Sequence, residues 1–261
     1  MKADYKNWMP KGMVCGLLAA AVIATAAALF FGWAPFLTGP AKTVIVIVLS
    51  AAAVLFWIAT IWTAVMYRAF DYHGSCQLSR RVIEGVASRV SVPDGGRCLD
   101  VGCGSGALAI AVAKRNPNAE ITGIDRWGKE YASFSLELCE KNARAEGVSN
   151  VLFRQGNAVK LDFPDETFDA VTSNYVYHNI PGDRQAILLE TLRTLKKGGT
   201  FAVHDAFVPV KYGDMQAFLQ KLRDMGYQKA ELIDTADGLF MTRSEARRTS
   251  LSGSALLLGV K

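Results

Sequence analysis

Residues 97–106 constrain the fold more than any other part of this chain. The segment reads Arg-Cys-Leu-Asp-Val-Gly-Cys-Gly-Ser-Gly and is followed by the helix-forming residues 107–115. An apolar run that ends in alternating glycines before a helical pattern predicts a buried strand turning sharply into a helix. Gly102, Gly104 and Gly106 would let a ligand approach the backbone, where the helix start presents free N–H groups. The segment predicts a site for an anionic or strongly polar ligand; the alternative is a glycine turn without a ligand.

Two kinds of cofactor fit this glycine pattern. The glycines and Ala107 satisfy the loose dinucleotide-binding spacing. Asp100 lies two residues before the first glycine, where its carboxylate would repel a pyrophosphate and attract an ammonium group. Residues 99–106 resemble motif I of class I S-adenosylmethionine-dependent methyltransferases. The resemblance implies that this loop, which includes Cys103, holds the methionine end of that cofactor.

Asp125 follows the second predicted strand, residues 120–124, and lies 19 residues beyond Gly106. A carboxylate at this strand end can accept hydrogen bonds from both ribose hydroxyls. Arg126 and Trp127 come next and are assigned to the same cofactor site. Trp127 could stack on adenine or border the substrate, or it could cover the sheet edge as a partly exposed aromatic.

The third predicted strand, residues 151–155, ends in a Gly-Asn-Ala loop that contains Asn157 and Ala158. In the family that this chain resembles, the loop usually reads Gly-Asp-Ala and its acid accepts from the adenine amino group. Asn157 can accept the same hydrogen bond without charge assistance, so the resemblance implies a weaker contact with adenine. Residues 161–169 resemble the segment that precedes motif IV of the same family.

The reacting centre is expected after the fourth predicted strand, at the edge where α/β sheets bind ligands. Asn174 is assigned to the cofactor, and Tyr175 and His178 are candidate catalytic residues. His178 could take a proton from a hydroxyl, thiol or carbon acid, or could simply hydrogen-bond within its loop. His204 and Asp205, at the tip of the fifth predicted strand, could be a base with its orienter or could bind substrate. Adjacent strand residues point to opposite sides, so at most one of the two is expected to face the substrate.

The predicted fold is a Rossmann-like, doubly wound α/β sheet of seven strands, preceded by a transmembrane helical hairpin. The resemblance covers residues 97–261 and implies an antiparallel last strand, which a dinucleotide dehydrogenase normally lacks. Periodicity predicts helices at 107–115, 129–146, 183–195 and 214–225, and strands at 97–101, 120–124, 151–155, 170–173, 200–203, 228–234 and 255–260.

Two long apolar segments precede this domain in a chain that is 51% hydrophobic. Residues 13–37 and 43–67 contain no charged side chain, and each would be about 37 Å long as a helix, enough to cross a bilayer. We predict two transmembrane helices joined by residues 38–42. A cleaved signal peptide is the alternative for the first, because Ala24-Thr25-Ala26 resembles a cleavage site, although the apolar run continues past it.

Small residues recur every four positions along the first apolar segment, at Gly16, Ala20, Ala24, Ala28 and Gly32. Such a ridge of small side chains favours helix–helix association in the membrane. An Ala-rich span could also produce this spacing by chance.

Basic residues indicate the orientation of the hairpin in the membrane. Three lysines precede the first segment, Lys42 stands alone between the two, and Arg68, Arg80 and Arg81 follow the second. The positive-inside rule then places both termini and the domain on the cytoplasmic side of the cell membrane, where S-adenosylmethionine is available. Beyond residue 67 the chain holds 25 basic and 23 acidic residues, so it lacks the basic footprint of a nucleic-acid binder.

A connector, residues 68–96, lies between the predicted hairpin of residues 1–67 and the predicted domain of residues 97–261. Tyr72 and His73 in the connector could close over the active site as a lid or could anchor the chain at the membrane interface. The connector also carries an apolar stripe that should pack on the domain as a lid or brace; the stripe consists of Leu78, Val82, Val86 and Val90.

The sequence thus predicts a membrane-anchored methyltransferase that uses S-adenosyl-L-methionine and acts on a small or lipophilic acceptor. The acceptor atom, whether O, S, N or C, stays open. The five cysteines show no paired metal spacing, and no metal is expected. Two alternatives remain, an NAD(P)-dependent oxidoreductase and a non-catalytic membrane scaffold that keeps the fold.

Overall fold

The computed structural model describes residues 2–128 and 133–261. These residues form two compact units. One unit is Asn7–Ser79, and the other combines residues 2–6 with Arg80–Lys261. The predicted boundary at residue 67 assigns the first few residues to the hairpin, whereas their contacts lie with the second unit.

The unit Asn7–Ser79 is built from two long helices, α1 (Lys11–Trp33) and α2 (Gly39–Phe70), which contact each other along their lengths. Both are long and apolar enough to cross a membrane by length and composition. The helix α1 ends before residue 37 because Pro35 disfavours helical backbone at the preceding residue. Pro40 lies in the first turn of α2, where its missing N–H costs nothing.

The predicted ridge of small residues lies only in part on the face of α1 that the structure buries, with Ala20 and Ala28 half-buried on either side of Ala24. The buried side chains of α1 are Ala21 and Ala24, whereas Gly16 and Gly32 are exposed with no atom near the position of a Cβ. Each step of four residues turns about 40° around a helix, so a strict four-residue ridge winds away from a partner. Of the predicted ridge, Ala24 therefore lies in the contact with α2.

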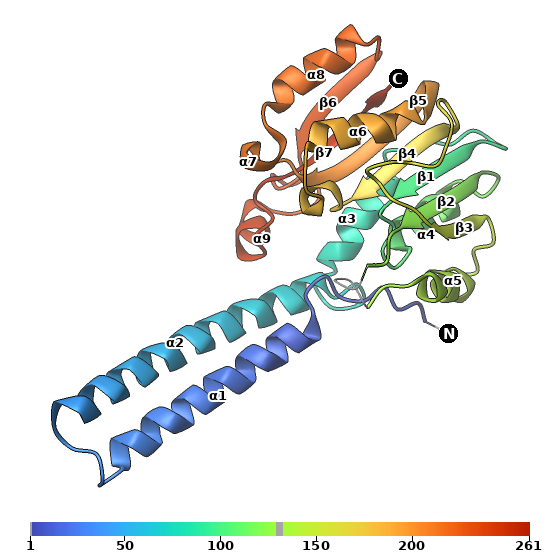
Figure 1. The fold of residues 1–261 in the computed structure, drawn as a ribbon. Helices are drawn as coiled ribbons and strands as arrows, with labels where there is room; N and C mark the ends of the chain where they lie inside the picture. Colours follow the sequence, from blue (N-terminus) through green and yellow to red (C-terminus); the bar gives the residue numbers. More distant parts are fainter. Residues whose placement is uncertain (1, 129–132) are drawn as a thin grey trace. The chain divides into compact units, whose positions relative to one another are not determined.

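The second unit contains a seven-stranded sheet in the order β3-β2-β1-β4-β5-β7-β6 (Figure 1). Its strands are β1 (Arg97–Val101), β2 (Glu120–Asp125), β3 (Val151–Gln155), β4 (Phe168–Asn174), β5 (Leu195–Ala206), β6 (Lys229–Asp234) and β7 (Ser254–Val260). The strand β7 is antiparallel to both β5 and β6. The predicted seven-stranded sheet with an antiparallel last strand is confirmed.

Helices cover both faces of this sheet. The helices after residue 77 are α3 (Leu78–Ala87), α4 (Ala107–Arg115), α5 (Leu136–Ala145), α6 (Arg184–Arg193), α7 (Pro209–Tyr212), α8 (Met215–Asp224) and α9 (Arg243–Arg248), among the described residues, with a 3-10 turn, η2 (Tyr177–Asn179). Of these, α4, α5, α6 and α8 contact the strands. Leu99 and Val101 of β1 face α6 and α8, whereas Asp100 faces Ala109 of α4, because strand side chains alternate. Figure 1 shows α6 and α4 on opposite sides of the strands.

The helix predicted at 129–146 corresponds to α5, Leu136–Ala145, among the described residues. Residues 129–132 lie outside the described residues, and α5 starts at Leu136. Ser135 caps it by accepting a hydrogen bond from the Leu138 N–H at 3.2 Å. A serine side chain that satisfies a free N–H fixes the start of a helix more firmly than the apolar periodicity that extends upstream.

The predicted apolar stripe of the connector is buried, since Leu78, Val82, Val86 and Val90 are each at most 7% exposed. From Arg80 onward this helix belongs to the sheet-containing unit. Gly85 packs against the ring of Phe240, where a Cβ would come within 2.6 Å of Cδ1. This close contact indicates that α3 is a brace on the domain.

The order in which successive strands are added to the sheet reverses between β1 and β4, because β2 and β3 extend the sheet on one side and β4 and β5 on the other. Both strands are parallel, so their carboxyl ends meet at one edge. Open α/β sheets bind ligands at this switch point. The residues that follow β1 and β4 therefore define the candidate site.

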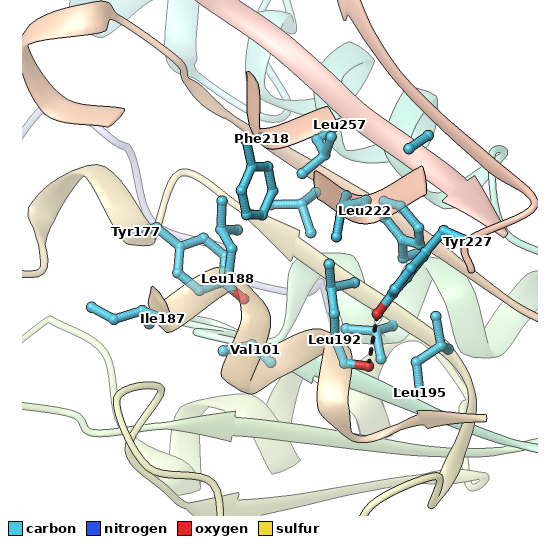
Figure 2. Close-up of a cluster of buried hydrophobic side chains, with 14 of the residues drawn as sticks. Val101, Tyr177, Ile187, Leu188, Leu192, Leu195, Phe218, Leu222, Tyr227 and Leu257 are labelled. Carbon is cyan, nitrogen blue, oxygen red and sulfur yellow. Dashed lines mark hydrogen bonds between the residues drawn. The ribbon is translucent and has the colours of Figure 1, made fainter. Parts of the chain in front are cut away.

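The main core lies between the sheet and the helices α6 and α8 (Figure 2). Leu188, Leu192, Phe218 and Leu222 interdigitate there and are almost fully buried. The hydroxyl of Tyr227 donates a long hydrogen bond of 3.4 Å to the Leu192 carbonyl, so its polar end is satisfied inside the core.

We expect Leu188→Ala to lower the free energy of unfolding by about 2–5 kcal/mol, because it removes buried methyl groups and leaves a cavity. Val210→Ala is the matched control, since Val210 is 91% exposed and its truncation should cost less than about 0.5 kcal/mol. Chemical denaturation of the detergent-solubilised chain measures both. Equal effects of the two substitutions would contradict the placement of Leu188 in the core.

Candidate active site

The glycine loop after β1 is the first part of the site. Gly102 and Gly106 have φ values of 73° and 81°. The side chain of Val176 occupies the place of a Cβ at Gly102, and the ring of Phe153 would lie 2.8 Å from one at Gly106. A side chain at either position would meet both a strained backbone and a filled space, so the turn requires glycine.

Asp100 lies just before this loop and is 1% exposed. The Thr172 hydroxyl donates to its Oδ1 at 3.0 Å, but its Oδ2 has no hydrogen-bond partner among the described residues. Burial raises the pKa of Asp100 to about 7, against the lowering effect of the Thr172 hydroxyl. A buried carboxylate oxygen without a partner is a place where a cationic group would be stabilised, as the sequence predicts for the cofactor's ammonium group.

Asp125 lies at the end of β2 and faces the same loop. Its Oδ2 accepts from the Gly104 N–H at 2.9 Å, and its Oδ1 accepts from the Trp127 N–H at 2.8 Å. Each carboxylate oxygen keeps a second lone pair, so ribose hydroxyls can still bind. The Trp127 indole N–H donates to the Gly104 carbonyl at 3.0 Å, and Arg126 is exposed. The structure thus joins Asp125 and Trp127 to the glycine loop.

The loop after β3 lies beside Asp125, because the Gly156 N–H donates to the Asp125 carbonyl at 2.9 Å. Asn157 is exposed, and its Oδ1 accepts from the Val159 N–H at 3.0 Å. The amide of Asn157 therefore already takes part in a local turn. Ala158 is half-buried next to it.

Helix α5 supports the glycine loop from behind. The Cys139 thiol donates to the Gly104 carbonyl at 3.1 Å, and the Asn142 amide donates to the Ser105 carbonyl at 2.9 Å. Cys103 of the glycine loop lies next to Cys139 of α5, and burial raises the pKa of the Cys103 thiol. The sequence contains no motif for Cys139 or Asn142, and a polar amide between the buried residues Cys139 and Ala143 of α5 is the one sign of this role.

His178 forms a buried pair with Asp205. Its Nδ1 lies 2.5 Å from Asp205 Oδ1, and Asp205 Oδ2 also accepts from the Tyr177 N–H at 2.8 Å. The Asp205 side chain is fully buried, whereas the His178 side chain is 19% exposed. An ionised carboxylate only accepts hydrogen bonds, so Nδ1 carries the proton and Nε2 is left as the basic atom. A carboxylate that holds the histidine ring in this way meets one geometric requirement for a general base.

His204 is fully buried on the other side of β5. Its Nδ1 lies 2.8 Å from Asn174 Oδ1, and its Nε2 lies 2.9 Å from Thr235 Oγ1. Burial lowers the pKa of His204 to about 3, which keeps it neutral. Both ring nitrogens are thus taken up within the core, so His204 is not positioned as a catalytic base. Asn174, assigned to the cofactor from the sequence, is engaged with this histidine.

The ring of Tyr175 contacts the rings of both His178 and His204. Its hydroxyl lies 2.5 Å from Ser254 Oγ, and its ring packs edge-on against His204 at 4.7 Å between centroids. Burial raises the pKa of Tyr175 above its ordinary value, so the hydroxyl stays protonated. Its φ of 55° is rare for a residue with a large side chain and marks a constrained backbone next to His178.

Tyr72 and His73 belong to the unit Asn7–Ser79. Their rings pack edge-on at 5.1 Å, and the His73 N–H donates to Asp71 Oδ1 at 3.0 Å. Their role as a lid on the active site stays a prediction. Within residues 2–128 and 133–261, no three His, Cys, Asp or Glu side chains gather in a way that could hold a metal ion.

Known proteins resemble this chain over the same region. A methyltransferase-domain family model matches residues 93–245. Demethylmenaquinone methyltransferase of Geobacillus kaustophilus is 35% identical over 136 residues, which are 52% of this chain and 56% of that protein. The chain therefore spans about half the length of the curated relatives that it matches.

Two solved structures share the fold. The [4+2]-cyclase SpnF has a TM-score of 0.55 and 23% identity, over 73% of this chain and 85% of the cyclase. The YcgJ protein of Bacillus subtilis has a TM-score of 0.50 and 22% identity, over 70% of this chain and 98% of its own. Identities this low establish the fold alone. The family match covers more than half of the chain, and with it the chain belongs to the methyltransferase-domain family.

Proposed function

We propose that this chain is an S-adenosylmethionine-dependent methyltransferase anchored in the cytoplasmic membrane. The observation that carries the proposal is the buried Asp100 carboxylate, whose unpartnered oxygen lies next to a glycine loop that Asp125 also faces. These two carboxylates fit a cofactor with a cationic methionine end and a ribose. It does not suit a dinucleotide, because Asp100 would repel the pyrophosphate.

Three parts of the chain would hold the cofactor. Asp125 would accept from the ribose hydroxyls, Asp100 would face the cationic end, and the N–H groups at the start of α4 would attract the carboxylate. When bound, the cofactor supplies a methyl group on a positively charged sulfur, which is the electrophile of the reaction. The protein's own task is then to position the acceptor and to remove its proton.

His178 is the proposed base. Nε2 accepts a proton from the acceptor, and Asp205 holds the ring in place and stabilises the imidazolium that forms. Loss of the proton from a hydroxyl leaves a nucleophilic oxygen. In a phenolic or enolic ring it also makes a ring carbon nucleophilic. After methylation at carbon, the hydrogen on that carbon moves to the ring oxygen and restores the ring, so removal of one proton by the base serves either acceptor atom.

A lipophilic, ring-hydroxylated acceptor is the substrate class that we infer. Curated relatives of this chain are named demethylmenaquinone methyltransferases, and the two apolar helices α1 and α2 would keep the enzyme at a bilayer in which such an acceptor dissolves. Large apolar side chains cover these helices on the outside, including Ile23, Leu55 and Ile61. The lysines that precede the apolar part of α1 and the arginines that follow the apolar part of α2 support a cytoplasmic domain.

Methyl-labelled S-adenosylmethionine tests this function directly. The detergent-solubilised chain is incubated with the labelled cofactor and a reduced demethylated quinone in mixed micelles, and the product is identified by mass spectrometry. We expect label in the quinol, and Asp125→Ala should abolish most of it by weakening cofactor binding at least tenfold. Absence of both cofactor binding by calorimetry and label transfer to any component of a lipid extract would contradict the proposal.

The base assignment predicts a specific loss of turnover. His178→Gln and Asp205→Asn should each lower kcat by about 10²–10⁴-fold, because the acceptor proton is no longer removed. The dissociation constant for the cofactor should stay within about threefold of that of the unmodified chain. Asn179→Gln, on the same turn and exposed, is the matched control and should turn over normally. Unchanged kcat in His178→Gln would show that no base acts here.

The raised pKa of Asp100 predicts how stability depends on pH. The carboxyl group titrates near pH 7 in the folded chain and near its ordinary value of 3.8 in the unfolded chain. Between these values the folded state holds the extra proton, so the Asp100 contribution to stability falls as pH rises through this window, by up to about 1.4 kcal/mol per pH unit.

Asp100→Asn removes this titration. The free energy of unfolding of the variant, minus that of the unmodified chain, should be larger at pH 8 than at pH 5. The cofactor affinity of the variant at pH 8 should fall at least tenfold. Thermal unfolding and calorimetry in detergent measure the two effects. Asp94→Asn at an exposed turn serves as control, and a pH-independent difference for Asp100→Asn would show that Asp100 is ionised throughout.

A further inference from the structure

The segment of residues 2–6, which precedes the first apolar helix, packs on the methyltransferase domain. Its side chains alternate, with Ala3 and Tyr5 buried at 4% and 5% exposure and Lys2, Asp4 and Lys6 exposed. This period of two is that of an extended strand with one face against the protein. In the sequence alone, these lysines indicate only the orientation of the hairpin in the membrane.

One buried amide fastens the segment to the domain. Asn142 of α5 is fully buried. Its Oδ1 accepts from the Asp4 N–H at 2.8 Å, and its Nδ2 donates to the Asp4 carbonyl at 2.9 Å. The Asn142 side chain thus binds both the backbone N–H and the backbone carbonyl of Asp4, as a neighbouring strand would.

The same amide reaches the glycine loop. The Asn142 Nδ2 also donates to the Ser105 carbonyl at 2.9 Å. Asn142 lies three residues after Cys139, which binds the adjacent Gly104 carbonyl, and residues three apart share a helix face. Side chains of α5 therefore hold two consecutive loop carbonyls, those of Gly104 and Ser105. The side chain that holds the Ser105 carbonyl, Asn142, also binds segment 2–6.

We propose that segment 2–6 is part of the cofactor site and that Asn142 is a positioning residue that transmits its effect. Both Nδ2 protons and the Oδ1 of Asn142 are used in this network. Without Asp4 the amide loses two partners inside the protein and is free to rotate away from Ser105. The Ser105 carbonyl then loses its anchor, and the N–H groups of the loop are no longer preorganised for the cofactor.

The inference rests on the proposed function and changes the consequence of the hairpin boundary predicted at residue 67. A truncation that removes residues 1–67 is expected to leave cofactor binding intact if those residues only form the hairpin. Because segment 2–6 belongs to the domain, the truncation removes part of the cofactor site as well. A hairpin deletion that spares the site must keep residues 2–6.

The test targets the Asp4 backbone in the full-length, detergent-solubilised chain. Asp4→Pro removes the N–H that Asn142 accepts, whereas the matched control Asp4→Ala keeps that N–H and removes only the exposed carboxylate, which pairs with Lys6 at 2.6 Å. We expect Asp4→Pro to weaken binding of S-adenosylmethionine by about tenfold and to raise its KM with kcat within about twofold. Asp4→Ala should stay within twofold in both.

Asn142 is tested in the same assay. Asn142→Ala should weaken cofactor binding at least as much as Asp4→Pro, and Asn142→Gln should restore part of the affinity. A role in overall stability alone would lower the thermal midpoint without separating KM from kcat. Cofactor affinity in Asp4→Pro equal to that of Asp4→Ala would overturn the proposal.

Hydrogen exchange separates this inference from the proposed function. In the absence of cofactor, amides of residues 102–108 should exchange faster in Asp4→Pro than in Asp4→Ala. If the unmodified chain fails to bind S-adenosylmethionine, the proposed function is wrong and the exchange rates alone decide whether segment 2–6 orders the loop. Identical exchange in the two variants overturns the link.

Discussion

The tight turn after β1 is the constraint on which the rest of the site depends. Val176 and Phe153 fill the spaces where Gly102 and Gly106 would carry side chains, and the N–H groups of Gly102 and Cys103 both donate to the Ile124 carbonyl. Strand β1 lies between β2 and β4, so the ends of these two strands are brought beside this turn. Asp125 at the end of β2 and His178 in the turn after β4 are thereby placed at one edge of the sheet.

Much of this could be predicted because it is local in the sequence. The strand, the glycine turn and the following helix occupy one continuous segment, and Asp125 follows the next strand at a spacing set by the βαβ unit. Boundaries were harder where one side chain overrides the periodicity. Ser135 starts α5 several residues after the apolar pattern begins. Likewise β5 starts at Leu195, since it pairs with Phe168 before the glycines.

The pairs that complete the site could not be predicted, because they depend on tertiary contacts. His178 finds its carboxylate 27 residues away, on a neighbouring strand. The sequence alone does not show which of His204 and Asp205 contacts His178. In the structure Asn174 is in register with His204, and Asp205 is the residue that contacts His178. Asn142 and Asp4 are separated by 138 residues, and no periodicity or motif connects them. Sequence patterns identify the residues that a strand end presents, but only register shows which of them meet.

The fold alone does not set the chemistry, since a [4+2]-cyclase shares it. In this chain particular side chains support the proposed methyl transfer to a protic acceptor: Asp100 suits a cationic cofactor, and the His178–Asp205 pair suits a base. The connectivity adds a further constraint. The chain leaves the domain after residue 6 and returns at Arg80, so the apolar hairpin is continuous at both ends with elements packed on the domain, segment 2–6 and α3. The hairpin is thus joined to the domain by two chain connections, and the first of them, segment 2–6, is hydrogen-bonded to Asn142, which also binds the glycine loop.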